Sequence, residues 1–454
     1  MLSALLVSTS NYVQRVSACA HPRSCHRPVM SELLRAVDDS RITTEQLTAA
    51  LRVLGQCDTA EVVAVDVVSE NRYPGSLSGV LRLSLSDHSV PRRIFVKKVT
   101  PQYVGRPWPA TRRTLAYART ESRFYQEFAT DDRVVGDFER LRVSLPRLAI
   151  SDCNLEVLLG NEPVHADAGP EPSGELQSRC GSLLLLEAAV GYSQTSPLSE
   201  PQAIQALQAV AGLHAVFWER ADILQAASCR LQRHGGCFAL EIREPEEVSQ
   251  VQSNWEKFAQ SFRDVDESLC MESFDLGARL QQASTWVSAQ MSPDPADAFV
   301  TLIHGDFKAM NVMLPSDGAP NPTHPMLIDF ASCGVGYGMS DVAMLLTHSV
   351  APSTLENGGL NRLIDAYLEA LAQREVRNYS KETCHWHFHL ATVDYARFVV
   401  SRFWGDASVE SFSKRAHNPN VCLPNRNVEA AIYFAKRLEK SLSLVEQSMG
   451  APCK

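Results

Sequence analysis

The sequence predicts an α+β protein with two lobes, a small antiparallel β lobe followed by a larger, mainly helical one. Three observations support this class. Residues 60–99 alternate apolar and polar positions and are rich in β-branched side chains, as half-buried strands are. Helical periodicity dominates after Gly191, and a short strand-rich segment at residues 299–330 interrupts it. The 454 residues are enough for two or three folding units.

The small N-terminal lobe is predicted to cover residues 31–187. It begins with an antiparallel meander of three strands, at residues 60–70, 80–87 and 92–99, with a break over residues 71–79. A helix follows, because apolar residues recur on one face at helical spacing: Tyr117, Phe124, Tyr125 and Phe128, with Glu121 among them. Two further strands, at residues 144–151 and 180–188, flank a loop insertion at about residues 159–180, whose Pro, Gly and acidic content is typical of an exposed loop.

The C-terminal lobe is predicted to cover residues 188–454 and to be mainly helical. Ser199 and Gln202 have the spacing of a capping box, which places the start of a helix there. Helical periodicity returns at residues 250–290, 340–375, 385–404 and in the last segment of the chain. The lobe therefore consists of helices around the strand-rich segment.

Composition limits the function classes. Hydrophobic residues at 45% and charged residues at 21% are typical of an ordered globular protein. The net charge of −9 repels phosphate backbones, so we expect no nucleic-acid partner. The 12 cysteines are scattered without a CxxC pair, which favours reduced thiols, and the apolar run 183–186 is too short for a transmembrane segment. We expect a cytoplasmic protein of unknown oligomeric state.

Residues 1–30 are predicted to form a disordered tail or a targeting segment. The first 31 residues contain no Asp or Glu and carry Arg15, Arg23 and Arg27 among many Ser and Ala residues. This composition is typical of an organelle transit peptide, which is the alternative to a cytoplasmic location. A translation start at Met30 would explain the same composition.

The motif HGDFKAMN, from His304 to Asn311, and the triplet IDF that ends at Phe330 carry the strongest functional signal. Phosphoryl transfer needs a carboxylate to accept or orient the attacking hydroxyl, and oxygen ligands to hold Mg²⁺ against the nucleotide phosphates. Asp306 supplies the first group, and Asn311 with Asp329 supplies the metal ligands. A hairpin between the two motifs would bring Asp329 beside Asn311.

The strand IFVK ends at Lys97, which could grip the nucleotide phosphates. Glu121 lies on an apolar helix face and needs a buried positive partner, because an unpaired buried carboxylate is costly. We therefore predict that Lys97 and Glu121 pair. Lys98 is the alternative, but successive residues of a strand face opposite sides, so only one of the two lysines points at the helix.

Together these motifs resemble the aminoglycoside/choline phosphotransferase superfamily, and most closely its ecdysteroid kinase-like branch. The resemblance extends over about residues 60–410 and includes the stretch 184–187, the helix segment 213–218, and Asp341. It implies a bilobal, protein-kinase-like fold, ATP and Mg²⁺ as cofactors, and a hydroxyl group of a small molecule as phosphate acceptor. Glu187 would end the hinge strand beside the nucleotide, and His304 would support the catalytic loop.

Two features depart from the usual pattern. Lys308 follows Asp306 by two residues and could meet the transferring phosphoryl group. The glycine-rich loop is degenerate, and only Gly75, Gly79, Ser76 and Ser78 remain as candidate phosphate contacts.

A protein kinase is disfavoured because Gly305 replaces Arg in the HRD motif and Ala331 replaces Gly in DFG. The other alternative is a catalytically silent binding or scaffold protein of the same fold, and the acceptor remains open.

Other conspicuous residues have a structural interpretation. His214 lies on an apolar stripe and is expected to be a hydrogen-bonded core histidine, and Asp341 is expected to brace the catalytic loop or cap its helix. The cluster from Cys384 to His389 contains three histidines but lacks acidic or cysteine partners at zinc-site spacing, so it is predicted to be structural. Three aromatic residues could line the acceptor pocket or belong to the core: Trp386, Phe403 and Trp404.

Overall fold

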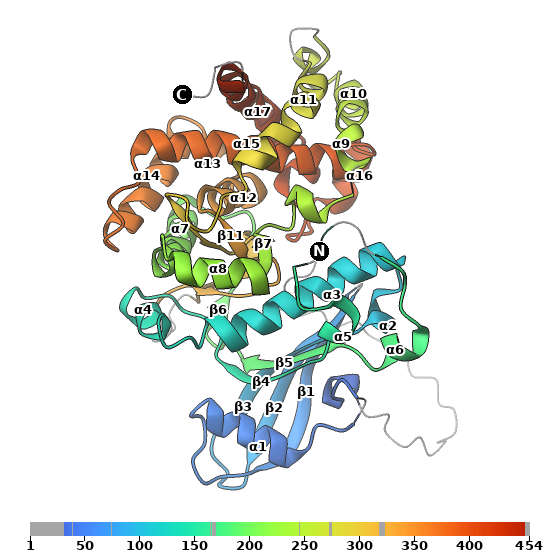
Figure 1. Cartoon of the computed structure of the whole chain (residues 1–454), viewed down its shortest axis with the longest axis vertical. Helices are drawn as coiled ribbons and strands as arrows, with labels where there is room; N and C mark the ends of the chain where they lie inside the picture. The colour runs from blue at the N-terminus through green and yellow to red at the C-terminus, as the bar shows by residue number, and fades with distance from the viewer. Residues whose placement is uncertain are drawn as a thin grey trace, which may run out of the picture.

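A computed structural model describes residues 31–449 of the chain, except residues 39, 74, 164, 166–168, 245, 272–274 and 317–322. The segment 1–30, for which we predict a tail or a targeting segment, lies outside the described residues. The described chain forms two lobes stacked along the long axis of the molecule (Figure 1). The predicted α+β class, with an antiparallel β lobe before a mainly helical lobe, is confirmed.

A five-stranded antiparallel sheet with the order β1-β2-β3-β5-β4 forms the small lobe. Its strands are β1 (Val62–Tyr73), β2 (Ser76–Leu85), β3 (Arg92–Val99), β4 (Leu148–Cys153) and β5 (Ser182–Glu187). The predicted break over residues 71–79 is wrong, because β1 and β2 form a tight hairpin whose strands continue through most of that segment. The predicted insertion lies between the neighbouring strands β4 and β5. It contains the short helix α6 (Gly174–Ser178), and another short helix, α5 (Glu156–Leu159), directly precedes it.

The two faces of this sheet pack against different elements. One face packs on the 3-10 turn η1 (Glu32–Leu34) and on α1 (Thr44–Val53), and the other packs on α3 (Trp108–Arg123), which continues as the π-helical turn η2 (Phe124–Phe128). Lys98 pairs across the sheet with Leu77 and Leu183, which belong to the α1 side. Lys97 therefore lies on the α3 side, as alternation along a strand requires. The short helices α2 (Pro101–Val104) and α4 (Val135–Arg140) flank α3.

Helices build most of the large lobe. The first, α7 (Glu200–Phe217), starts with the predicted capping box of Ser199 and Gln202. The longer helices that follow are α8 (Ala221–Arg230), α10 (Val251–Ser261), α11 (Leu276–Gln290), α12 (Met339–Ser349), α14 (Gly359–Ala372), α15 (Lys381–Phe403) and α17 (Val428–Met449). The short ones are η3 (Leu240–Ile242), α9 (Glu246–Ser249), η4 (Glu267–Cys270), η6 (Ala309–Asn311), α13 (Pro352–Leu355), α16 (Val409–Arg415) and η7 (Leu423–Asn425).

Two three-stranded sheets lie in the large lobe where the strand-rich segment was predicted. One has the order β10-β9-β6 and the other the order β7-β11-β8. Their strands are β6 (Tyr192–Ser193), β7 (Gln232–His234), β8 (Val300–Ile303), β9 (Val312–Pro315), β10 (Met326–Leu327) and β11 (Gly334–Tyr337). The sequence did not predict β6, β7 and β11, which have two to four residues each.

One hydrophobic core connects the lobes. It includes Phe124 and Leu184 from the small lobe together with Phe307 and Phe330 from the strand-rich segment. Phe124 and Phe330 stack with ring centroids 3.9 Å apart, so the end of α3 is packed directly against the residue after Asp329. This contact fixes the position of α3 relative to the loop of the large lobe.

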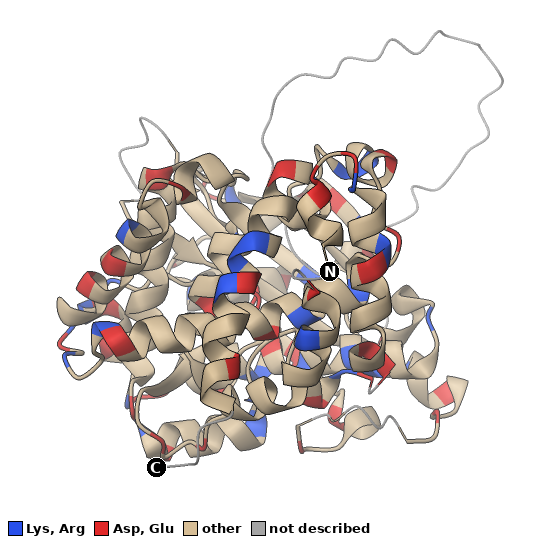
Figure 2. Cartoon of the chain, turned by 90° about the horizontal axis from the view of Figure 1, so that it is seen from above, with Lys and Arg blue, Asp and Glu red and all other residues tan. Residues whose placement is uncertain are grey.

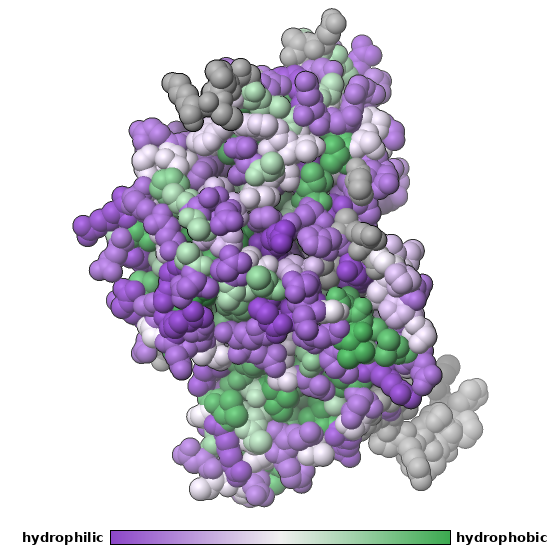
Figure 3. Space-filling view, in the orientation of Figure 1, coloured by the Kyte–Doolittle hydropathy of each residue, from purple (hydrophilic) through white to green (hydrophobic). Residues whose placement is uncertain are grey.

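The face of the molecule shown in Figure 3 is mostly polar. On the face shown in Figure 3, hydrophilic residues cover much of the large lobe and hydrophobic residues gather over parts of the small lobe. Basic and acidic positions are interspersed on the side seen in Figure 2. Within the described ranges, no helix is long and apolar enough to cross a bilayer, and the cysteines of this part of the chain are free thiols.

Candidate active site

The loop after β8 holds a cluster of polar side chains that the core surrounds. Gly305 has a φ of 79°, and a Cβ there would lie 1.9 Å from the carbonyl oxygen of Ser332, so only glycine fits. The carboxylate of Asp341 accepts hydrogen bonds from the backbone N–H groups of His304 at 2.7 Å and Gly305 at 2.9 Å. The predicted role of Asp341 as a brace for this loop is confirmed.

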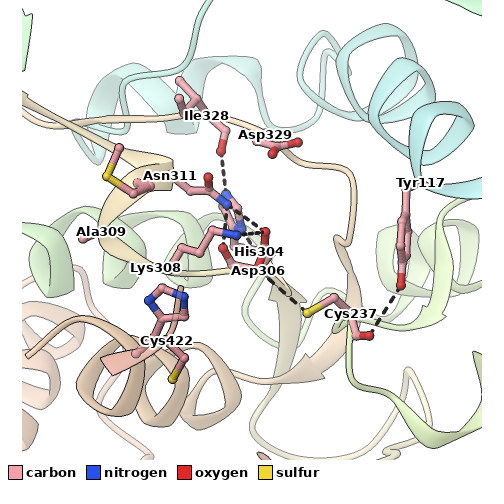
Figure 4. A network of polar contacts seen from close by, with 12 residues as sticks. Tyr117, Cys237, His304, Asp306, Lys308, Ala309, Asn311, Ile328, Asp329 and Cys422 are labelled. Carbon is pink, nitrogen blue, oxygen red and sulfur yellow. Dashed lines mark hydrogen bonds and ion pairs between the residues drawn. The ribbon is translucent and has the colours of Figure 1, made fainter. Parts of the chain in front are cut away.

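His304 connects this loop to the segment after β10 that carries Asp329. Its Nε2 lies 2.9 Å from the carbonyl oxygen of Ile328, and its Nδ1 lies 3.3 Å from the backbone nitrogen of Asp306. A nitrogen beside a carbonyl oxygen must donate, so Nε2 carries a proton and Nδ1 can accept from Asp306. His304 thus holds the two acidic segments together and does not itself contact Asp329 (Figure 4).

Asp306 is almost fully buried and has a cation beside it. Its Oδ2 accepts a hydrogen bond from Lys308 Nζ at 2.8 Å and another from Asn311 Nδ2 at 3.1 Å (Figure 4). Burial alone would raise the pKa of Asp306, but nearby positive groups, Lys308 first among them, together outweigh burial, so the pKa lies below its ordinary value. Lys308 shows the reciprocal shift: burial lowers its pKa, but the Asp306 carboxylate and other nearby acidic groups outweigh burial, so the pKa lies above its ordinary value.

A second charged group joins the two lobes. Lys97 Nζ lies 2.5 Å from Glu121 Oε2 and 2.8 Å from Asp329 Oδ1. The predicted pairing of Lys97 with Glu121 is therefore present, and Asp329 is a further partner that the sequence did not predict. Burial disfavours the ammonium of Lys97, but the two carboxylates outweigh it and raise its pKa. Burial raises the pKa of Glu121, and the attraction of Lys97 opposes that shift.

Two buried oxygen atoms between these groups have no hydrogen-bond partner among the described residues, Asn311 Oδ1 and Asp329 Oδ2. The two residues are close, because the backbone N–H of Ile328 donates to the carbonyl oxygen of Asn311 at 3.1 Å. Buried polar atoms are normally paired, so these oxygens need a partner from outside the chain. Amide and carboxylate oxygens are hard ligands, and this pair fits a magnesium ion that keeps its other positions for phosphate and water.

Asp329 has an unusual backbone conformation. Its φ of 67° lies in the left-handed region, which costs a residue other than glycine about 1 kcal/mol. Such conformations persist where the surrounding structure fixes them, and they are common at functional sites. Here the pairing with Lys97 and the stacking of the next residue, Phe330, on Phe124 hold the turn in place.

A buried hydrogen-bond chain supports the catalytic loop from behind. His214 Nε2 lies 3.1 Å from Asp341 Oδ2, and His214 Nδ1 lies 2.8 Å from the hydroxyl of Tyr367. Gly338 makes room for this chain, since a Cβ there would lie 2.3 Å from that hydroxyl. The prediction of His214 as a hydrogen-bonded core residue is confirmed. The sequence did not predict Ser349, whose Oγ accepts the backbone N–H of Ala309 at 2.9 Å.

Cys237 and Tyr117 lie near Asp306 and were not predicted as part of the site, and Arg113 makes a further contact on the same helix. Cys237 Sγ lies 3.9 Å from Asp306 Oδ1, and the hydroxyl of Tyr117 donates to the carbonyl oxygen of Cys237 at 3.4 Å (Figure 4). Burial raises the pKa of Cys237 to about 12, so it remains a thiol. Arg113 of α3 forms an ion pair with Glu244 at 2.7 Å. These contacts join α3 to the segment after β7, and no sequence motif marks them.

The predicted phosphate-binding residues lie in the hairpin of β1 and β2 instead of an open loop. The backbone N–H of Gly75 donates to the carbonyl oxygen of Tyr103 at 2.9 Å, and it is therefore not available to a phosphate. Ser76, Ser78 and Gly79 belong to β2 instead of a loop, and both hydroxyls are buried. Ser78 pairs in register with Lys97, so it lies on the α3 side of the sheet. The hairpin turn is too tight to form a loop of the predicted length.

Glu187 also differs from the expected position. It pairs in register with Ile94, which belongs to the α1 side of the sheet, and its carboxylate forms an ion pair with Arg147 at 3.0 Å. Its side chain therefore faces away from Lys97, and a nucleotide beside Lys97 would meet at most the backbone of this strand end.

The histidine cluster on α15 is structural, as predicted. His387 Nδ1 lies 2.9 Å from the hydroxyl of Tyr379, whereas His389 Nδ1 lies 3.0 Å from Ser441 Oγ. In the described part of the chain, no group of three or more His, Cys, Asp or Glu side chains could hold a metal ion. Trp404 is fully buried and stacks on Phe258 with centroids 3.8 Å apart, so it belongs to the core and does not line an acceptor pocket.

The chain matches one family. The model of the ecdysteroid kinase-like family matches residues 190–378, a segment that contains the catalytic loop, Asp329 and Asp341 but neither Lys97 nor Glu121. The predicted resemblance is confirmed for this segment, which is shorter than the range 60–410 that we expected. No curated protein matches the chain significantly.

The chain aligns with several solved structures over most of its length. An amicoumacin kinase in complex with AMP-PNP, Ca²⁺ and Ami has 11% identity over 89% of this chain and 96% of that chain, with a TM-score of 0.42. A spectinomycin phosphotransferase in complex with ADP and spectinomycin has 10% identity over 90% and 99%, with a TM-score of 0.39. A choline kinase from Cryptosporidium parvum Iowa II has 12% identity over 90% and 98%, with a TM-score of 0.38.

Proposed function

We propose that this protein, which matches the ecdysteroid kinase-like family over residues 190–378, is an ATP-dependent phosphotransferase that acts on a hydroxyl group of a small molecule. One observation carries the proposal. Each of two charged groups contributes one buried oxygen that lacks a partner among the described residues. The oxygen of the Asp306–Lys308–Asn311 group is Asn311 Oδ1, and the oxygen of the Lys97–Glu121–Asp329 group is Asp329 Oδ2. Phosphoryl transfer requires these groups: a carboxylate for the acceptor hydroxyl, a cation for the phosphates and oxygen ligands for the metal ion.

Asp306 is proposed to act on the acceptor. Its carboxylate is held by Lys308 and Asn311 and has a lowered pKa, so it is ionised at neutral pH. It would accept the proton of the acceptor hydroxyl while that oxygen forms a bond to the γ-phosphorus of ATP. The bond from the γ-phosphorus to the bridging oxygen breaks, and ADP leaves with the electron pair. Lys308 can shift from Asp306 toward the transferring phosphoryl group and stabilise its charge.

The remaining residues are proposed to hold the nucleotide. Asn311 Oδ1 and Asp329 Oδ2 would ligate magnesium, which would neutralise phosphate charge when bound. Lys97 would contact the phosphates from the small lobe, and Glu121 would keep its ammonium in place. His304, Asp341, His214 and Tyr367 keep the loop in one conformation, so little reorganisation is needed at the moment of transfer.

The reaction is tested by measuring ADP release from purified protein against a library of hydroxylated metabolites, with Mg·ATP in excess. We expect at least one acceptor to raise ADP release well above the rate with water alone, and Asp306→Asn to abolish that increase. Binding of ATP without transfer to any acceptor would favour the alternative of a silent binding or scaffold protein. Phosphorylation of peptides in place of metabolites would favour a protein kinase.

We infer a cytoplasmic location from the free thiols in the described part of the chain.

A further inference from the structure

The irregular segment 236–238, between β7 and η3, lies directly against the catalytic loop. The backbone N–H of Cys237 donates to the carbonyl oxygen of Gly305 at 3.0 Å. The backbone N–H of Gly236 donates to the carbonyl oxygen of Ser332 at 2.9 Å. A Cβ on Gly305 would lie 2.6 Å from the backbone nitrogen of Gly236, so the two stretches of chain approach as closely as glycine permits. The segment therefore forms one wall of the proposed active site.

The two carboxylate oxygens of Asp306 have different neighbours. Oδ2 accepts hydrogen bonds from Lys308 and Asn311, and these two donors fill the lone pairs of that oxygen. Oδ1 lies 3.9 Å from Cys237 Sγ, and a thiol is a weak donor that a hydroxyl can displace (Figure 4). In this arrangement an acceptor hydroxyl reaches the carboxylate at Oδ1, and it arrives beside Cys237.

Two helices hold Cys237 and its neighbour Phe238 in place. From α3, the hydroxyl of Tyr117 donates to the carbonyl oxygen of Cys237 at 3.4 Å. From α15, Arg397 Nη2 donates to the carbonyl oxygen of Phe238 at 2.5 Å. The Phe238 ring packs edge-on to the ring of Tyr395 on the same helix, with centroids 5.3 Å apart. Helix α15 therefore fixes the residue next to Cys237 through both its backbone and its side chain.

Arg397 is fully buried and forms an ion pair with Asp394, one turn earlier on α15, at 3.0 Å. The two charges balance, but a buried ion pair adds little stability compared with apolar side chains of similar size. Burial raises the pKa of Asp394, and the Arg397 guanidinium offsets only part of this shift. The fixed position of the Phe238 carbonyl is therefore a better explanation of the pair than stability.

We propose that Cys237 borders the acceptor hydroxyl and that Arg397 is a positioning residue that keeps Cys237 in this place. This inference rests on the proposed function, because it concerns the acceptor side of the same site. The acceptor proton moves to Asp306 Oδ1, and the thiol takes no chemical part, because burial and the charge of Asp306 raise the pKa of Cys237 to about 12. Lys97 and the metal ligands belong to other segments, so loss of Arg397 weakens use of the acceptor and leaves nucleotide binding intact.

The test removes both buried charges together, with Asp394→Leu and Arg397→Met in one protein. Replacing a whole buried ion pair by apolar residues often preserves the fold, whereas Arg397→Met alone would leave the Asp394 carboxylate unpaired. With the acceptor found by ADP release, kcat/KM for the acceptor should fall about 10-fold or more, since small displacements near reacting atoms are costly. The Kd of Mg·ATP from calorimetry should stay within about 2-fold of wild type.

Two further variants separate positioning from a general structural effect. Arg397→Lys should recover part of the lost kcat/KM, because its ammonium can still pair with Asp394 and donate to the Phe238 carbonyl. Arg402→Met, on the same helix, removes an arginine that pairs with Glu247 at 3.2 Å and should change neither kcat/KM nor the Kd of Mg·ATP.

Cys237→Leu decides the matter if the double variant fails to fold. The larger side chain beside Oδ1 should lower kcat/KM for the acceptor about 10-fold or more and keep Mg·ATP binding, whereas Cys229→Leu at an exposed position of α8 should change neither. The inference is overturned if Cys237→Leu or the double variant keeps wild-type kcat/KM, or if Mg·ATP binding falls in step with it. Failure of the proposed function is a different result, because wild-type protein would then transfer phosphate to no acceptor.

Discussion

The two charged groups of the proposed active site are assembled in different ways. The large-lobe group, Asp306, Lys308 and Asn311, comes from six consecutive positions of one loop. The group around Lys97 comes from three elements, since Glu121 lies 24 and Asp329 lies 232 positions away along the chain. The first group needs only the local geometry of a loop, whereas the second exists only when both lobes are folded and docked.

This difference has an energetic consequence. The loop group is held by backbone hydrogen bonds to Asp341 and Ser349, so its geometry persists if the lobes move apart. The group around Lys97 depends on one bridge across the lobes, Lys97 to Asp329, and on the packing of Phe124 against Phe330. We expect the group around Lys97 to be the adjustable part of the site and the loop with Asp306, Lys308 and Asn311 to be the fixed part.

The largest expected effect comes from the fixed part. Asp306→Asn should lower turnover about 100-fold or more, because acid–base positioning contributes that much. The amide can still accept from Lys308, so the fold and ATP binding should remain. Turnover with the acceptor found by ADP release is the measurement, and Asp58→Asn on the surface is the control. A variant with near-wild-type turnover would remove Asp306 from the mechanism.

The adjustable part should show a different pattern. Lys97→Met should lower kcat/KM about 100-fold, because a phosphate contact is lost, and Glu121→Gln should lower it less, because Lys97 keeps Asp329. The double variant should be little worse than Lys97→Met alone, since residues that act as a unit are not additive. A double-mutant cycle in kcat/KM measures this coupling.

Lys98 provides the matched control for that cycle. It is the next residue of β3 but faces the α1 side, where its Nζ donates to the carbonyl oxygen of Ala36 at 3.0 Å. Lys98→Met should therefore change stability without changing kcat/KM of the folded protein. Independent, multiplicative effects of Lys97 and Glu121, or a larger loss for Lys98→Met, would show that the pairing across the sheet has no catalytic role.

The two lobes should also respond differently to acid. Burial lowers the pKa of His348 to about 3 and that of His387 to about 4, so both are neutral in the folded large lobe. In the unfolded chain they take up a proton below about pH 6.5. The unfolded state then binds more protons, and stability falls from about pH 6.5 toward pH 4, by at most about 1.4 kcal/mol per pH unit for each histidine. The described histidines of the small lobe, His88 and His165, are exposed.

Hydrogen exchange at pH 7 and pH 5 measures this difference lobe by lobe. Amides of α12 and α15 should lose protection at pH 5 before those of the small-lobe sheet. His387→Gln should reduce the acid sensitivity of the melting temperature, whereas His385→Gln, two positions away and half-buried, should not. Equal loss of protection in both lobes would contradict the assignment of acid sensitivity to these buried histidines.

The same contrast explains what the sequence could and could not predict. The loop residues form a contiguous motif, so their types and spacing predicted the chemistry directly. Lys97 and Glu121 were predicted because strand alternation and helix periodicity each fixed a face. The bridge to Asp329 was missed because it depends on how the lobes dock, which no local pattern encodes. The direction of the Glu187 side chain was not predicted, because it depends on the register of β5 against β3.

The prediction of a break over residues 71–79, before β2, was wrong for a related reason. A Pro-Gly pair followed by serines is compatible with a long phosphate-binding loop and with a tight hairpin, and propensity does not distinguish them. The hairpin is favoured here by the pairing of β1 and β2 and by the hydrogen bond from Gly75 to Tyr103. Cys237 was missed because a single residue in an irregular segment carries no periodicity. Arg113 was missed because its partner, Glu244, lies 131 positions away along the chain.

The central claim is that the two groups meet at one metal and nucleotide site, and calorimetric titration of ATP in the presence of Mg²⁺ or of EDTA tests it most directly. Wild-type protein should bind ATP at least about 10-fold more tightly with Mg²⁺, because Asn311 Oδ1 and Asp329 Oδ2 supply oxygen ligands. Asn311→Ala and Asp329→Ala should each remove this difference, although the residues come from separate segments. If either variant kept the full Mg²⁺ dependence, the account of a shared site would be contradicted.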